Sequence, residues 1–191
     1  MSEMVKRCTI SNVIVIGFSF GKCREPSSLN GTNGGLAWSV AALLRQFRKC
    51  KRIRPRLCLQ QDIAEAFVNH GFGKLHANDH VIPSRTRDGQ YVSTSMVYRE
   101  AARLIKDMHH VIVVAHPDHA PRCMRIIRES GHLPIRTRYL QPLGGGIPWT
   151  RFGCDRRGYC QASTQPWTRT RRQFLQHEAR LHTKTSRRRL H

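Results

Sequence analysis

The stretch that decides the fold is residues 111–122, which read VIVVAHPDHAPR. Its first five residues are all apolar, which predicts a short strand buried on both faces. Pro121 suits the first position of a helix, so a helix is expected from there to about Ser130 and Gly131. A strand that leads through a polar turn into a helix is the repeating unit of α/β folds.

The same alternation of strand and helix extends along the chain in both directions. Further strands are expected at residues 13–16, 56–60, 80–82 and 133–140. Helices are expected at residues 36–49, 62–70, 93–105 and beyond Trp167, with a glycine-rich loop at 17–35 and an irregular segment at 144–165. This order predicts an α/β fold: a mainly parallel sheet with helices on both faces, joined by right-handed crossovers.

The length and composition agree with one domain. The chain has 191 residues, of which 39% are apolar, so it can bury a real core and is not a disordered basic chain. Its best apolar run, residues 13–16, is far shorter than the roughly 20 residues of a membrane-spanning helix. Because the start lacks a secretory pattern and the seven cysteines form an odd, scattered set, we expect a cytoplasmic protein with reduced thiols.

The chain is strongly basic. It carries 33 Lys and Arg against 12 Asp and Glu, a formal charge of +21. Residues 151–191 hold 11 basic and 2 acidic residues, so this end contributes +9 and the remaining excess is spread along the chain. Such surfaces attract phosphates in a salt-dependent way, which makes nucleic-acid binding an alternative function. No nucleic-acid reader motif accompanies the charge.

In a parallel sheet, ligands bind outside the carboxyl ends of the strands, where loops and helix N-termini present backbone N–H groups. Four loops occupy that edge in the expected fold: residues 17–33, 60–62, 90–94 and 116–122. The predicted ligand-binding residues in them are Gly17, Ser19, Gly21, Thr94, His116, His119 and Arg122. Arg122 would pair an anion, His119 and His116 would exchange protons near neutral pH, and Thr94 and the Gly17 loop would supply hydrogen bonds.

Residues 17–21, GFSFG, also fit the G-x-S-x-G nucleophile elbow, which raises a serine hydrolase as an alternative, with Ser19 as nucleophile and His119 as base. An α/β-hydrolase has several strands before its elbow and a helix directly after it, and residues 22–26 do not look helical. A phosphate-binding P-loop is excluded because only three residues separate the two glycines and Cys23 replaces the required Ser or Thr.

The carboxy-terminal part offers two weaker patterns. Cys154, Cys160, His177 and His182 miss the spacing of a zinc finger at two places, so no metal site is expected. Trp167 and Phe174 are seven residues apart, which favours one helical face packed into the core.

Together these motifs resemble the YdcF/SanA-like (ElyC-type) family of α/β domains, whose function is largely unassigned. The resemblance rests on residues 13–17, 93–94 with 100–101, 113–122 with its His-x-x-Arg, 163–169, 174–175 and 177–178. It implies a single Rossmann-like, three-layer domain over residues 1–183, followed by a basic, disordered tail at 184–191. It also implies a small polar or nucleotide-like ligand, and the family is loosely associated with S-adenosylmethionine. The chain departs from the family where Gln60 and Gln61 stand in place of two glycines and Val97 in place of an asparagine.

The leading hypothesis is therefore a cytoplasmic α/β protein that binds a small anionic or nucleotide-like ligand at the carboxyl ends of its strands. The sequence assigns no reaction to it.

Overall fold

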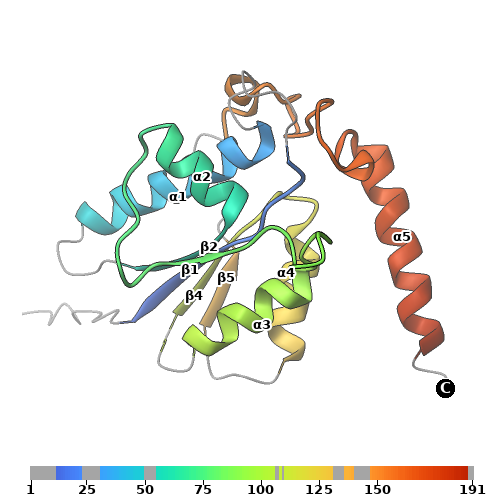
Figure 1. Cartoon of the computed structure of the whole chain (residues 1–191), viewed down its shortest axis with the longest axis horizontal. Helices are drawn as coiled ribbons and strands as arrows, with labels where there is room; N and C mark the ends of the chain where they lie inside the picture. Colours follow the sequence, from blue (N-terminus) through green and yellow to red (C-terminus); the bar gives the residue numbers. More distant parts are fainter. Residues whose placement is uncertain are drawn as a thin grey trace, which may run out of the picture.

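The computed structural model describes residues 12–22, 31–49, 55–105, 108, 110–130, 136–139 and 147–188. The sheet has five strands: β1 (Val13–Gly17), β2 (Arg56–Gln60), β3 (His80–Ile82), β4 (His110–Val114) and β5 (Arg136–Tyr139). They lie in the order β3-β2-β1-β4-β5, and each neighbouring pair is parallel. The predicted α/β fold with a parallel sheet is confirmed (Figure 1).

Helices cover both faces of the sheet. Helices α1 (Gly31–Lys49) and α2 (Gln61–Asn69) pack on one face, and α3 (Thr94–Ile105) and α4 (Ala120–Glu129) pack on the other (Figure 1). Side chains alternate along the central strand, so that Val15 contributes to the first core and Ile14 and Ile16 to the second. All five residues of β1 are buried, as the continuous apolar run predicts.

The strand order fixes where a ligand site can form. β1 and β4 are parallel neighbours, with Val13 opposite His110 and Gly17 opposite Val114, which confirms the expected pairing. After β1 the chain turns to α1 on one face, and after β4 it turns to α4 on the other. The two loops therefore diverge at the carboxyl edge, and this reversal is where open α/β sheets form their ligand crevice.

Helix α1 begins at Gly31, five residues before the expected start, so part of the predicted loop is helical. Close packing explains the glycine at position 35 of this helix. A Cβ added at Gly35 would lie 2.5 Å from the ring of Trp149, which belongs to the 3-10 helix η1 (Trp149–Phe152). Glycine thus lets the chain after β5 pack directly on α1, a need that local sequence patterns do not reveal.

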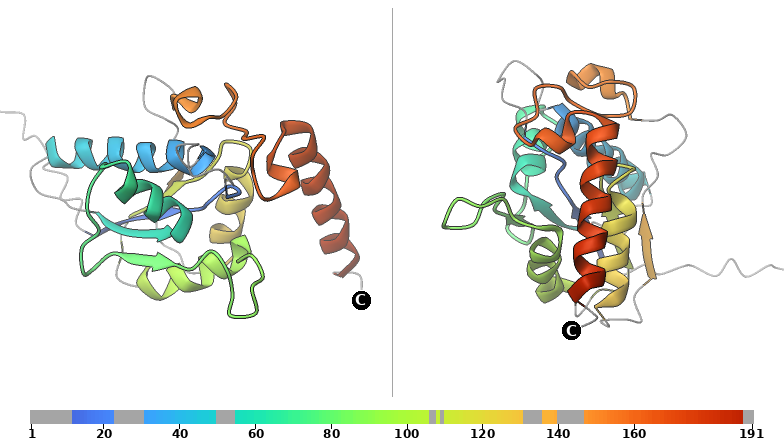
Figure 2. Two further views of the ribbon diagram at one scale, coloured as in Figure 1. Left: turned by 45° about the horizontal axis from the view of Figure 1, so that its top comes forward. Right: turned by 90° about the vertical axis from the view of Figure 1, so that its right-hand side faces the viewer.

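We call residues 147–188 the C-terminal segment. It contains η1, a second 3-10 helix η2 (Pro166–Thr168) and helix α5 (Arg171–Arg188), which stands beyond the carboxyl edge of the sheet (Figures 1 and 2). Phe174 is buried as expected, with 1% of its surface exposed, but Trp167 lies in η2 rather than α5 and is 36% exposed. The prediction that Trp167 shares a buried helical face with Phe174 is therefore wrong.

Helix α5 also runs past the expected domain end at residue 183. Residues 184–188 are helical rather than a loose tail, and residues 189–191 lie outside the described part. Neither glycine nor proline occurs between Arg171 and Arg188, so no residue there breaks the helix.

None of the helices in the described part combines the length and apolar character needed to cross a membrane. The two longest helices, α1 and α5, both carry several basic side chains.

Candidate functional site

A cavity of about 390 Å³ lies at the carboxyl ends of the strands. Its volume falls in the range of about 300–1,000 Å³ that is usual for small-molecule sites. The residues that line it come from five parts of the chain: Ser19, Phe20, Gln60, Tyr91, Val92, Ser93, Thr94, Ser95, His119, Arg122, Ile126, Gln165, Trp167, Thr168, His177 and Leu181. The loop after β1, the end of β2, the start of α3 and the turn from β4 into α4 form its base and sides, and the C-terminal segment supplies the remaining wall.

Of the seven predicted ligand-binding residues, Ser19, Thr94, His119 and Arg122 line this cavity. Gly17 and Gly21 serve close packing instead. A Cβ added at Gly17 would lie 2.8 Å from the Leu59 side chain. Gly21 has a φ of +68°, and a Cβ there would lie 2.3 Å from the hydroxyls of Ser163 and Thr168.

His116, the third predicted residue outside the cavity wall, has a structural role. It is 1% exposed and stacks on Phe20 with ring centroids 4.1 Å apart. The backbone N–H of Asp118 donates to its Nδ1 at 3.2 Å, and its Nε2 lies 2.7 Å from the carbonyl of Arg157. Because a carbonyl can only accept, Nε2 carries the proton and the ring is neutral. Burial lowers the pKa of His116 to about 4.

His119 lines the cavity and donates to the hydroxyl of Thr94. The Nη2 of Arg122 donates to its Nδ1 at 3.1 Å, and since that nitrogen accepts, the ring proton is on Nε2. Nε2 lies 3.4 Å from the hydroxyl of Thr94. Burial and the neighbouring Arg122 charge hold the pKa of His119 well below its ordinary value, so the ring is neutral near pH 7. A neutral ring whose acceptor nitrogen is already used is poorly suited to act as a base.

The charge of Arg122 is paired within the chain. Its Nη1 donates to the carboxylate of Glu178 on α5, and both side chains are largely buried. The Nε of Arg122 is buried without a hydrogen-bond partner among the described residues. Residues 177–178 contribute to the family resemblance, but the sequence assigns no role to Glu178 because its partner Arg122 lies 56 residues away. The sequence signal that could have pointed to Glu178 is that Asp155 and Glu178 are the only acidic residues of the basic stretch 151–191.

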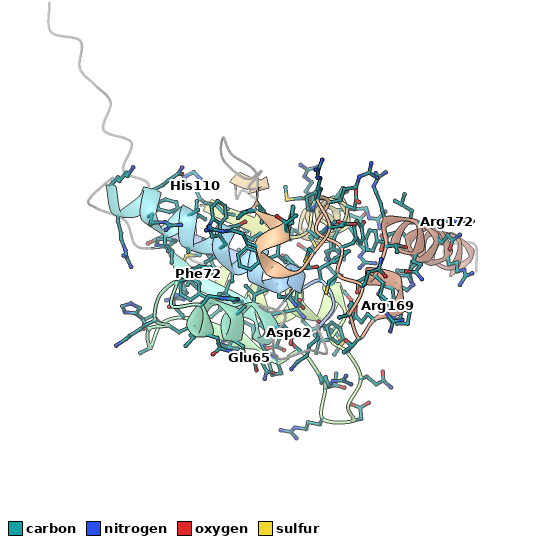
Figure 3. All side chains as sticks on the ribbon, turned by 90° about the horizontal axis from the view of Figure 1, so that it is seen from above. Asp62, Glu65, Phe72, His110, Arg169 and Arg172 are labelled. Atoms are coloured by element: carbon teal, nitrogen blue, oxygen red, sulfur yellow. The ribbon has the colours of Figure 1, made fainter. Side chains whose placement is uncertain are left out.

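Ser19 belongs to a different hydrogen-bond chain. Its hydroxyl lies 2.8 Å from that of Tyr91, which in turn donates to the carboxylate of Asp62 at 2.8 Å. Asp62 projects from α2 beside Glu65 (Figure 3). Because the Tyr91 proton goes to Asp62, Ser19 donates its own proton to Tyr91. Burial and the charge of Asp62 raise the pKa of Tyr91, so this phenol is neutral.

These contacts give little support to the serine hydrolase. Within the described residues, Ser19 hydrogen-bonds Tyr91, whereas His119 hydrogen-bonds Thr94 and Arg122. The contact between nucleophile and base that defines such an enzyme is not among them.

Gln60, the last residue of β2, is the second functional residue that the prediction missed. It is 3% exposed, lines the cavity and accepts the backbone N–H of Ser19 at 2.7 Å. Its amide nitrogen, Nε2, is buried without a hydrogen-bond partner in the described part of the chain. The loop at residues 60–62 was expected at this edge, but only the packed structure shows that one amide group is left unsatisfied.

No model of a known protein family, no curated protein and no solved structure matches this chain. The resemblance to the YdcF/SanA-like family therefore stays a prediction, and the function has to be argued from the chain's own residues.

Proposed function

We propose that this protein binds a small ligand with an anionic group in the cavity at the carboxyl ends of its strands. The observation that carries the proposal is the pair of buried nitrogens, Nε2 of Gln60 and Nε of Arg122, that lack partners among the described residues. Both side chains line the cavity. A buried donor without a partner costs about 1–3 kcal/mol. Because both nitrogens are buried, a ligand oxygen removes that cost once the two side chains shift toward the cavity.

The start of α3 adds further donors to the same wall. Ser93, Thr94 and Ser95 all line the cavity, and the first turn of this 12-residue helix contains no acidic residue. Its N-terminus carries the positive end of the helix dipole and backbone N–H groups that favour phosphate or carboxylate. The Nε2–H of His119 donates to the hydroxyl of Thr94, so this hydroxyl can donate its own proton toward the cavity. The donor set therefore suits an anionic group with several oxygens.

The rim of the cavity is aromatic and apolar. The rings of Trp167 and His177 are stacked, with centroids 4.6 Å apart and planes 12° apart, and both line the cavity. Ile126 and Leu181 complete this apolar side. A flat ring would stack on Trp167 while an attached anionic group reaches the donors, which favours a nucleotide-like ligand. S-adenosylmethionine, suggested by the family resemblance, has an adenine ring and a carboxylate and belongs among the ligands to test.

Thermal unfolding with a small ligand panel tests the proposal. The panel contains adenosine 5′-monophosphate, S-adenosylmethionine, ribose 5-phosphate, adenosine and inorganic phosphate. A ligand at 100 times its Kd should stabilise the wild type by about 2.7 kcal/mol. Gln60→Glu keeps the oxygen that accepts from Ser19 but replaces the unsatisfied N–H donors by an acceptor, so it should abolish the shift. Gln46→Glu, at an exposed position of α1, is the matched control. Absence of any shift in the wild type would contradict the proposal.

A second candidate, binding of a phosphate-rich polymer, is favoured by a separate groove on the C-terminal segment. Arg157, Arg171 and Arg172 line it together with Leu175, Gln176 and Ala179. Arg172 lies on the same segment as Arg169 (Figure 3), and Arg171 also pairs with Asp118 at 3.0 Å. Three guanidinium groups around one groove concentrate charge that is otherwise spread over the surface.

Duplex binding measured over a range of salt concentrations tests this candidate. Replacing Arg171 and Arg172 by Glu should weaken duplex binding if these groups contact phosphates. It should also lower the slope of log K against log salt concentration by about 1–2. Reversing Arg45 and Arg48, exposed on α1, is the control for charge alone. An equal effect of both pairs would show that the groove is not a binding site.

A further inference from the structure

The pair between Arg122 and Glu178 has an unusual position. It joins α4 to α5, with 19% of the Arg122 side chain and 14% of the Glu178 side chain exposed. Arg122 lines the cavity, and Glu178 follows directly after His177, which also lines it. Glu178 is one of two acidic residues in a stretch that holds 11 basic ones. A carboxylate is thus placed against the cation that the sequence assigns to a ligand.

The guanidinium of Arg122 is only partly used by this pair. One nitrogen, Nη1, contacts Glu178, a second contacts His119, and the third, Nε, is buried without a partner among the described residues. An arginine side chain presents its N–H groups as a planar fork that can hold a carboxylate or phosphate through two parallel hydrogen bonds. Nη1 forms its fork with Nη2, which carries a second N–H besides the one directed at His119, so an anion that replaces Glu178 can bridge Nη1 and Nη2.

Helix α5 can release Glu178 without uncovering the core. Phe174 is the buried side chain that anchors the described part of α5, and Glu178 lies one helical turn further on. Most other positions from Arg171 to Leu181 are exposed. Rotation of the Glu178 side chain toward solvent leaves Phe174 in place, so the movement costs little apolar burial.

We infer that Glu178 competes with the anionic group of the ligand for Arg122, because its carboxylate already pairs with the guanidinium that lines the cavity. The inference rests on the proposed function and names the recognised chemistry: a phosphate or carboxylate group that bridges two nitrogens of Arg122. While Glu178 pairs with Arg122, the protein cannot bind the anionic group. The apparent Kd therefore equals the intrinsic Kd divided by the fraction of protein in which this pair is open.

The decisive experiment compares full-length wild type with Glu178→Gln by calorimetric titration of adenosine 5′-monophosphate. The amide keeps the shape of the side chain and removes its charge. We expect the variant to bind at least about tenfold more tightly, which corresponds to about 1.4 kcal/mol. Adenosine, which has the same ring without the phosphate, should bind both proteins equally. Glu100→Gln, which removes an exposed pair with Arg103 on α3, is the matched control and should change neither affinity.

The outcomes separate the two proposals. If wild type binds and Glu178→Gln binds equally or more weakly, the competition inference is overturned while the proposed function stands. If only Glu178→Gln binds, Glu178 competes strongly enough to prevent binding in the wild type, which supports the inference. If neither protein binds any ligand of the panel, the proposed function fails and the inference fails with it.

A measurement on the wild type keeps the inference testable if Glu178→Gln does not fold. The carboxyl carbon of Glu178, assigned by NMR in labelled protein, should move toward the shift of a solvated glutamate when the ligand saturates the site. An unchanged signal at saturation would refute the competition.

Discussion

Acid should destabilise this protein through His116 in a way that one substitution can isolate. The ring is neutral when folded, and burial lowers its pKa from 6.5 to about 4. The unfolded chain therefore binds more protons between those values, and the stability contributed by His116 is present above pH 6.5 and falls as the pH drops toward 4. Integrating this difference gives a loss of about 2 kcal/mol between pH 7 and pH 5.

Urea unfolding followed by tryptophan fluorescence at pH 7 and pH 5 measures this loss. His116→Gln should lower stability at pH 7, because the stacking on Phe20 is lost, yet it should lose about 2 kcal/mol less than wild type on going to pH 5. His119 is present in both proteins, and the main causes of its lowered pKa, burial and the Arg122 charge, act in both, so most of its contribution cancels in the comparison. Equal losses in the two proteins would refute the assignment of a neutral, buried His116.

Three further substitutions test the packing around the site. Gly35→Ala should destabilise by about 1–3 kcal/mol in urea unfolding, because the new Cβ would lie 2.5 Å from the Trp149 ring; unchanged stability would mean that the two can separate freely. Arg122→Met should cost about 2–3 kcal/mol, below the 3–5 kcal/mol of a fully buried pair because both partners are partly exposed, and the double variant with Glu178→Gln should recover part of it. Phe174→Ala should cost about 3 kcal/mol and speed amide exchange across α5, whereas equal exchange in α5 and the sheet would contradict its role as the anchor of that helix.

The parts of this fold that sequence predicted well are those set by local patterns. β1 and β4 are continuous apolar runs, and Ser93 caps α3 by accepting the N–H of Met96 at 3.3 Å. Because parallel strands bring their carboxyl ends to one edge, the loops near Ser19 and His119 could be placed together before any contact was known.

The parts that sequence did not predict depend on contacts between distant segments. Gln60 and Glu178 lie in stretches that the sequence singles out, but their contacts depend on what lies against them after folding. In the same way, His116 and His119 share one turn and one residue type, yet the first packs in an aromatic cluster and the second faces the cavity. His116 lies in the turn before α4 and is fixed by the Arg157 carbonyl, whereas His119 is the N-cap residue of α4 and contacts Arg122, and the residue type alone cannot distinguish them.

The C-terminal segment explains why His116 and His119 have different surroundings. Its two acidic residues act at the two ends of the turn after β4. Asp155 accepts the backbone N–H groups of Arg157 and Tyr159, which shapes the loop whose carbonyl receives His116. Glu178 pairs with Arg122 beside His119. The site therefore depends on a segment remote in sequence: the Asp155 loop holds His116 in a packing role, and Glu178 pairs the charge of Arg122 beside His119.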